Sequence, residues 1–137
     1  MAPSLLATDI VLNWYDNSKF TEGLREIFKK KGQQPTFITM RLGEKWAKKL
    51  IAVPAPIGYV VHISISNDPD NPNVIGQAMI ESVRLGSVES FVRDRAILEK
   101  NIGAKTWRRA LKDIAKAYGI PKVSLGMTLT VIELFPI

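Results

Sequence analysis

Hydrophobic residues recur at helical spacing most regularly near the end of the chain, in residues 104–118. At about 100° per residue, the apolar positions of this stretch fall in one narrow stripe: Trp107, Leu111, Ile114 and Tyr118. Gly119 can adopt the left-handed conformation that ends a helix, and Pro121 cannot continue one. The pattern therefore predicts a helix over residues 104–118 with one apolar face.

Four other stretches show helical spacing of their apolar residues. The first begins at a capping residue, Asn17 or Ser18, and ends before Gly32. Three further helices are expected over residues 44–51, 74–85 and 88–101. Only brief breaks separate the last two from the helix over residues 104–118, so we expect three consecutive helices to form a layer.

Apolar and polar residues alternate in three stretches, which is the pattern of strands with one buried face. These stretches are residues 36–42, 59–66 and 122–134, and a short apolar run over residues 9–15 predicts a fourth strand. Prolines make residues 53–56 an extended connector, and residues 67–73 have the composition of a loop.

The order of these elements predicts an α+β fold with two layers. About four strands would form a mixed or antiparallel sheet, with the helices packed on one face. The other face would carry mainly polar side chains, which suits such a sheet better than a parallel sheet covered on both sides. Its residues would be Thr39, Arg41, His62, Ser64, Ser66, Ser124, Thr128 and Thr130.

Composition is that of a globular protein and narrows the class of function. The 137 residues are 46% hydrophobic and 23% charged, so we expect a single domain over residues 1–137. The absence of cysteine excludes disulfides, zinc-thiolate sites and thiol nucleophiles. No apolar run approaches the roughly 20 residues of a membrane span, and residues 1–10 lack a secretory signal. We expect a soluble, intracellular protein, either cytoplasmic or associated with the nucleoid or nucleus.

The chain is basic, with a net charge of +6 and an isoelectric point of about 9.7. Residues 84–118 carry nine basic and four acidic groups, whereas residues 59–83 carry no basic group and three acidic ones. Two stretches concentrate cations at helical spacing, which is the arrangement that phosphate contacts require. The candidate binding residues are Lys105, Arg108, Arg109, Lys112 and Lys116 in one stretch, and Lys45, Lys48 and Lys49 in the other.

Other motifs are incomplete. Residues 88–101 and 104–118 could form a helix-turn-helix, but Glu99 stands where a small residue is usual, which favours a plain helical hairpin. His62 begins half of a histidine-x-hydroxyl pattern that needs a second histidine, and it is the only one. The loop from Asp68 lacks the glycine and the closing glutamate of a calcium loop, since Asn73 and Met79 stand there.

The leading hypothesis is a small nucleic-acid-binding protein that contacts the phosphate backbone of DNA or RNA through its basic helical faces. The alternative is a structural or assembly protein, such as a viral or phage component, that self-associates through the apolar C-terminal strand. A metal-dependent nuclease or phosphodiesterase is a third possibility, with carboxylates from Asp9, Asp16, Glu44 or Glu81. The sequence assigns no catalytic residue, metal ligand or cofactor, and we favour a non-enzymatic role.

Overall fold

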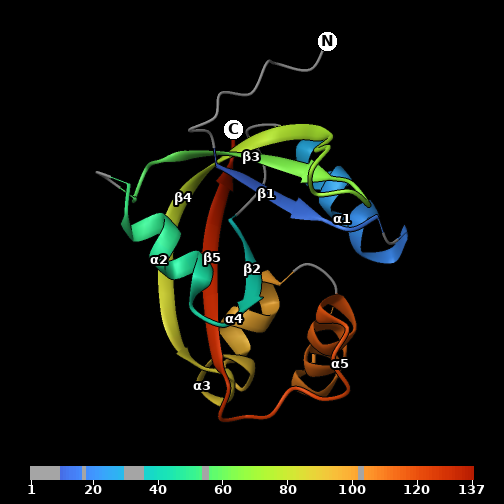
Figure 1. Cartoon of the computed structure of the whole chain (residues 1–137), viewed down its shortest axis with the longest axis vertical. Coiled ribbons are helices and arrows are strands. Elements are labelled where there is room, and N and C mark those ends of the chain that lie inside the picture. Colours follow the sequence, from blue (N-terminus) through green and yellow to red (C-terminus); the bar gives the residue numbers. More distant parts are fainter. Residues whose placement is uncertain (1–9, 17, 30–35, 54–55, 102–103) are drawn as a thin grey trace.

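The computed structural model describes residues 10–16, 18–29, 36–53, 56–101 and 104–137 (Figure 1). Within them, one mixed sheet has the strand order β1-β3-β4-β5-β2. The strands are β1 (Val11–Trp14), β2 (Phe37–Leu42), β3 (Val60–Ile65), β4 (Val74–Ser87) and β5 (Thr128–Pro136). Only β1 and β3 are parallel neighbours. The α+β class and the mixed sheet are confirmed, with five strands in place of about four.

Five helices accompany the sheet in the described residues. They are α1 (Ser18–Lys29), α2 (Lys45–Ile51), α3 (Val88–Val92), α4 (Arg95–Lys100) and α5 (Trp107–Tyr118). None of the described helices is both long and apolar enough to cross a bilayer. Helix α5 ends as its sequence indicates, because Gly119 takes the left-handed conformation with a φ of 64°. It starts at Trp107, so Lys105 precedes the helix.

Strand β5 is buried on both of its faces. Leu129 and Val131 belong to a hydrophobic cluster that includes α3, α4 and α5, whereas Ile132 and Leu134 belong to a second cluster that includes α1 and α2. Successive strand residues point to opposite faces, so the two clusters lie on opposite sides of the sheet. This corrects the expected packing of helices on one face: both faces are covered.

Residues 74–85 form most of strand β4, so the predicted helix over this stretch is wrong. The strand pairs with β3 on one side and β5 on the other, and its register with β5 shifts between Ile80 and Ser82. Ala78 and Ile80 face the core before the shift, and Val83 packs against the same cluster after it. The bulge adds one residue to the apolar spacing, and the resulting interval of three resembles helical spacing.

Residues 88–101 also differ from the prediction, because two short helices replace one long helix. Ser87 caps α3 by accepting a hydrogen bond from the backbone of Ser90, and Asp94 caps α4 in the same way from Ala96. The second cap at Asp94 starts a new helix and breaks the one predicted over these residues. A helix-turn-helix that uses residues 88–101 as its continuous first helix is therefore not formed.

The two edge strands, β1 and β2, approach each other. Nη1 of Arg41 in β2 donates to the main-chain oxygen of Asn13 in β1, at 3.0 Å, although these strands lie at opposite ends of the strand order. The sheet is therefore curved enough for a side chain of one edge strand to form a hydrogen bond with the other edge strand. The outer edge of β2 is also covered, because Ile38 bridges to Asn101 and the amide of Leu42 donates to the hydroxyl of Tyr118.

The C-terminal strand lies inside the sheet. Strand β5 pairs with β4 on one side and with β2 on the other along most of its length. Its main-chain hydrogen bonds are used within the chain, which corrects the expectation of an unprotected terminal strand.

Candidate nucleic-acid interface

Two of the five candidate cations near α5 are engaged within the protein. Nζ of Lys105 donates to the main-chain oxygens of Glu99 and Asn101, and Arg109 pairs with Asp113 at 3.4 Å, one turn along the helix. The other three are exposed and form no ion pair with a carboxylate in the described residues: Arg108, Lys112 and Lys116. Arg108 also lies against Trp107, with its guanidinium 5.2 Å from the ring centre, so Lys112 and Lys116 are the cations of α5 that a phosphate can reach without disturbing a described contact.

The three candidate lysines of α2 are all exposed, but they differ in their contacts. Lys48 pairs with Glu44 at 2.7 Å. Nζ of Lys49 lies 4.7 Å from the ring centre of Trp46, which places an aromatic surface next to a cation. Lys45 forms no ion pair with any described acidic residue. Helix α2 therefore offers two cations, one of them against an indole ring.

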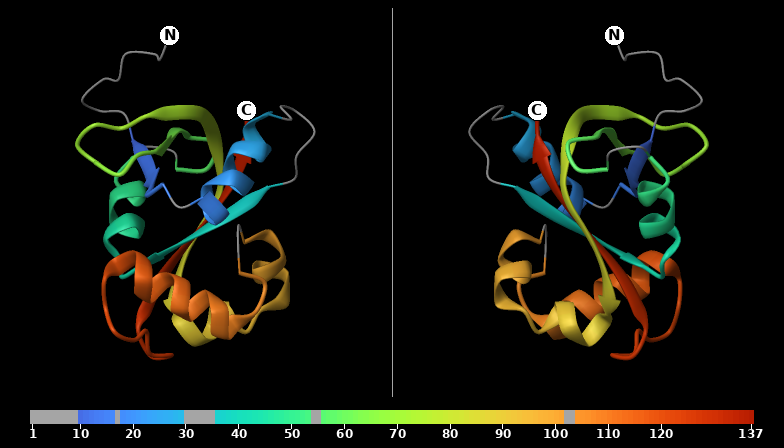
Figure 2. Two further views of the ribbon diagram at one scale, coloured as in Figure 1. Left: turned by 90° about the vertical axis from the view of Figure 1, so that its right-hand side faces the viewer. Right: turned by 90° about the vertical axis from the view of Figure 1, so that its left-hand side faces the viewer.

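Helices α2 and α5 meet at the C-terminal end of β2. The hydroxyl of Tyr118, the last residue of α5, accepts a hydrogen bond of 2.9 Å from the amide of Leu42. The guanidinium of the preceding Arg41 lies 5.8 Å from the ring centre of Trp46 in α2. Figure 1 shows α2 and α5 on either side of the end of β2, and Figure 2 shows one end of α5 and α2 near that strand end. The two helices pack on opposite faces of the sheet, and each contacts the end of β2.

Arg41 lies at the centre of this region, which we call the Arg41 cluster: Asn13, Trp14, Thr39, Arg41 and Trp46. The guanidinium carbon is 4.6 Å from the ring centre of Trp14, closer than to Trp46. Nε donates to Oγ1 of Thr39 and Nη1 to the main-chain oxygen of Asn13, both at 3.0 Å. Nη2 is buried and has no hydrogen-bond partner among the described residues. Burial lowers the pKa of Arg41 to about 10, although the nearby Tyr118 opposes this shift.

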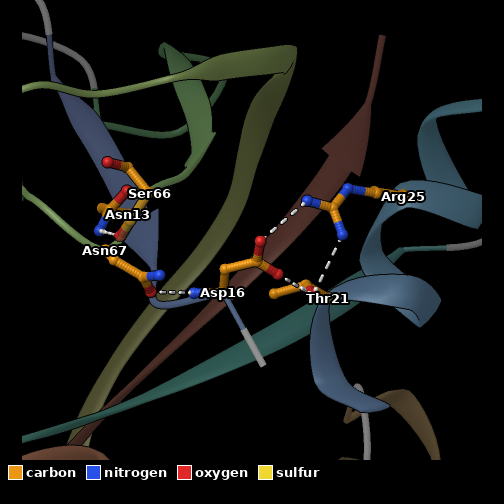
Figure 3. Close-up of polar contacts among 6 residues, drawn as sticks. All are labelled: Asn13, Asp16, Thr21, Arg25, Ser66 and Asn67. Carbon is orange, nitrogen blue, oxygen red and sulfur yellow. Dashed lines mark hydrogen bonds and ion pairs between the residues drawn. The ribbon is translucent and has the colours of Figure 1, made fainter. Parts of the chain in front are cut away.

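A polar network holds the turn that follows Trp14 (Figure 3). The side-chain amide of Asn13 donates to the main-chain oxygen of Ser66, and the amide of Asp16 donates to the side chain of Asn67. The carboxylate of Asp16 accepts a hydrogen bond from Thr21 and pairs with Arg25 at 3.6 Å. The network joins β1 to α1 and to the loop after β3, and so fixes the strand end that carries Trp14.

Cations beside aromatic rings suit a nucleic-acid ligand. Exposed lysines contact phosphates, and aromatic side chains provide surfaces on which bases stack. Tyr15 follows Trp14 in the sequence, and the hydroxyl of Tyr118 lies at the amide of Leu42, next to Arg41. These two tyrosines are 54% and 43% exposed. The sequence analysis placed Arg41 only on a polar strand face. The signal that could have singled it out is a lone cation within the buried strand over residues 36–42.

The other candidate residues are placed elsewhere or bound internally. His62 is buried, with Nδ1 at 3.5 Å from the side-chain amide of Gln77. The carboxylate of Asp68 accepts hydrogen bonds from Asp70 and Asn71 within its own loop. No three acidic or histidine side chains gather into a metal-binding group in the described chain. Asp9 lies outside the described residues.

A second polar region lies on the opposite face of the sheet. An open pocket of about 420 Å³ is lined by residues of β2, β4, β5 and α4, among them Arg84, Asp94 and Glu133. Hydrogen bonds from Lys100 and Thr36 lower the pKa of Glu133 below its usual value. Both carboxylates are therefore engaged within the protein, Glu133 by Lys100 and Asp94 by the amide of Ala96.

No protein-family model matches the chain, and no curated protein matches it. Among solved structures, it is similar to an ASCH domain from Lactobacillus crispatus JV V101, with 15% identity and a TM-score of 0.49 over 93% of this chain and 79% of that one. It is also similar to a mutant ASCH protein from Zymomonas mobilis, with 15% identity and a TM-score of 0.49 over 95% of this chain and 75% of that one. Both likenesses are too remote to assign a family or a ligand.

Proposed function

We propose that the chain binds nucleic acid on the surface around the C-terminal end of β2. Phosphates contact the exposed cations of α2 and α5, and the Arg41 cluster lies between them. The observation that carries the proposal is that both helices contact the same strand end, α2 through Trp46 beside Arg41 and α5 through Tyr118 at Leu42. The contacting cations are Lys45, Lys49, Arg108, Lys112 and Lys116.

These five cations form no ion pair with a described carboxylate, which favours phosphate binding over a purely structural role. Lys48 and Arg109 already have acidic partners one helical turn away, as is usual for surface helices. The five contacting cations have no such partner in the described part of the chain. They keep their full attraction for an external polyanion, because no internal carboxylate must be displaced.

The partner is either DNA or RNA, and the proposal does not extend to self-association through the terminal strand. Strand β5 is paired on both sides, so its main chain offers no free edge to a second copy.

Binding should depend steeply on salt. About five neutralised phosphates correspond to a log-log slope of roughly −3.5 to −4.5, or roughly a 130- to 500-fold weaker affinity when salt rises from about 50 mM to about 200 mM. Fluorescence anisotropy with short labelled single and double strands of DNA and RNA measures both quantities. The proposal is contradicted if no binding is measured at low salt, or if the affinity does not change with salt concentration.

A further inference from the structure

The guanidinium of Arg41 keeps one hydrogen-bonding edge unused. Two of its three nitrogens donate within the protein, Nε to Thr39 of the same strand and Nη1 to Asn13 of β1. Nη2 finds no acceptor in the described residues although it is buried. A buried charged donor without an acceptor loses its hydration and gains nothing in return, so an acceptor from outside the chain would bind there favourably.

The charge of Arg41 is also uncompensated. Arg41 forms no ion pair with a described carboxylate, and Asp16 at the nearby end of β1 is engaged by Arg25 and Thr21 (Figure 3). Its pKa of about 10 still leaves the guanidinium protonated near neutral pH. A poorly hydrated cation attracts an oxyanion more strongly than a cation in water does, because screening is weaker there.

The surroundings restrict the size of the acceptor. Trp14 and Trp46 both lie against the guanidinium, and Trp46 is the more distant of the two rings. Trp14 belongs to a strand whose end is fixed by the polar network, whereas Trp46 is half-buried on the first turn of a seven-residue helix. Because Nη2 is itself buried beside these rings, an acceptor that reaches it must be small.

We infer that Arg41 receives one oxyanion of the ligand through Nη2, and that in a bound nucleic acid this oxyanion is a terminal phosphate. The inference rests on the proposed function. An internal phosphodiester is linked to a nucleotide on each side, which makes it too bulky to reach the buried Nη2. A terminal phosphate is linked to a nucleotide on one side only. Arg41 then recognises a strand end, and the lysines of α2 and α5 bind the phosphates that follow.

Oligonucleotides of one sequence, with and without a terminal phosphate at either end, test the inference. The wild-type protein should bind one phosphorylated form about tenfold more tightly than the unphosphorylated strand. Arg41→Lys keeps the charge but removes the Nη2 donor, and should lose this gain. Arg95→Lys, a matched change at an exposed position outside α2 and α5, should keep it. Equal affinities for all forms, or a gain that Arg41→Lys retains, would overturn the inference.

A second measurement does not depend on the variant or on nucleic acid. Nitrogen-15 signals of the arginine guanidinium groups are followed in the wild-type protein as inorganic phosphate is added, and then acetate at equal ionic strength. The Arg41 signals should shift saturably with phosphate and far less with acetate, whereas those of Arg95 in α4 should change little. No shift at Arg41, or an equal response to acetate, overturns the assignment. Failure of the unphosphorylated strand to bind would instead contradict the proposed function alone.

Discussion

Replacing Lys45, Lys49, Lys112 and Lys116 together by glutamate is expected to weaken nucleic-acid binding by more than about 100-fold at low salt. Each substitution removes a phosphate contact and places a like charge against the backbone. All four side chains are exposed and without ion pairs to described residues, so stability should change by less than about 0.5 kcal/mol for each one. Fluorescence anisotropy measures the affinity, and thermal unfolding measures the stability.

A control variant with the same change in net charge separates a local surface from a general attraction. Glutamate at four other exposed cations serves this purpose: Lys29, Arg93, Arg95 and Lys122. These residues lie outside α2 and α5, so the control should weaken binding by no more than about tenfold. Equal losses in the two variants would show that net charge alone, and not the surface around β2, governs binding.

Leu129→Ala and Ile132→Ala are each expected to lower the free energy of unfolding by about 2–5 kcal/mol. Both side chains are fully buried, and they point to opposite faces of β5 into different hydrophobic clusters. Each substitution leaves a cavity in one cluster. Denaturant unfolding at constant pH measures the two losses.

Val60→Ala on β3 is the matched control, because this side chain is 40% exposed. This substitution should lower the free energy of unfolding by less than about 1 kcal/mol, since folding buries little apolar area at that position. If helices covered only one face of the sheet, either Leu129 or Ile132 would face solvent. A small loss at one of them and a large loss at the other would contradict the packing described here.

The fold was predictable where one pattern dominates a stretch. The strand over residues 59–66 and the helix end at Gly119 follow from alternation and from a glycine that tolerates positive φ. Strand β4 was not predictable, because its bulge between Ile80 and Ser82 interrupts the period of two. The packing of helices on both faces of the sheet was not predicted, because the sequence does not show on which face each helix packs.

The candidate interface was predictable in its cations but not in its centre. Helical spacing placed Lys112 and Lys116 on an exposed face, and both are exposed in the structure. Lys105 was predicted on the helix but precedes α5, and its ammonium donates to main-chain oxygens. The contact of Arg41 with Trp14 joins residues of opposite edge strands, and no local pattern reports a contact that depends on the curl of the sheet.

The most direct test of the proposed interface is a two-dimensional amide NMR spectrum recorded while a short oligonucleotide is added to the wild-type protein. The largest shifts should map to the C-terminal end of β2, to α2 and to the last turn of α5, and they should reverse when salt is raised. Shifts concentrated instead at α4 around the pocket of Glu133, or no shifts at low salt, would contradict the assignment of the interface to this surface.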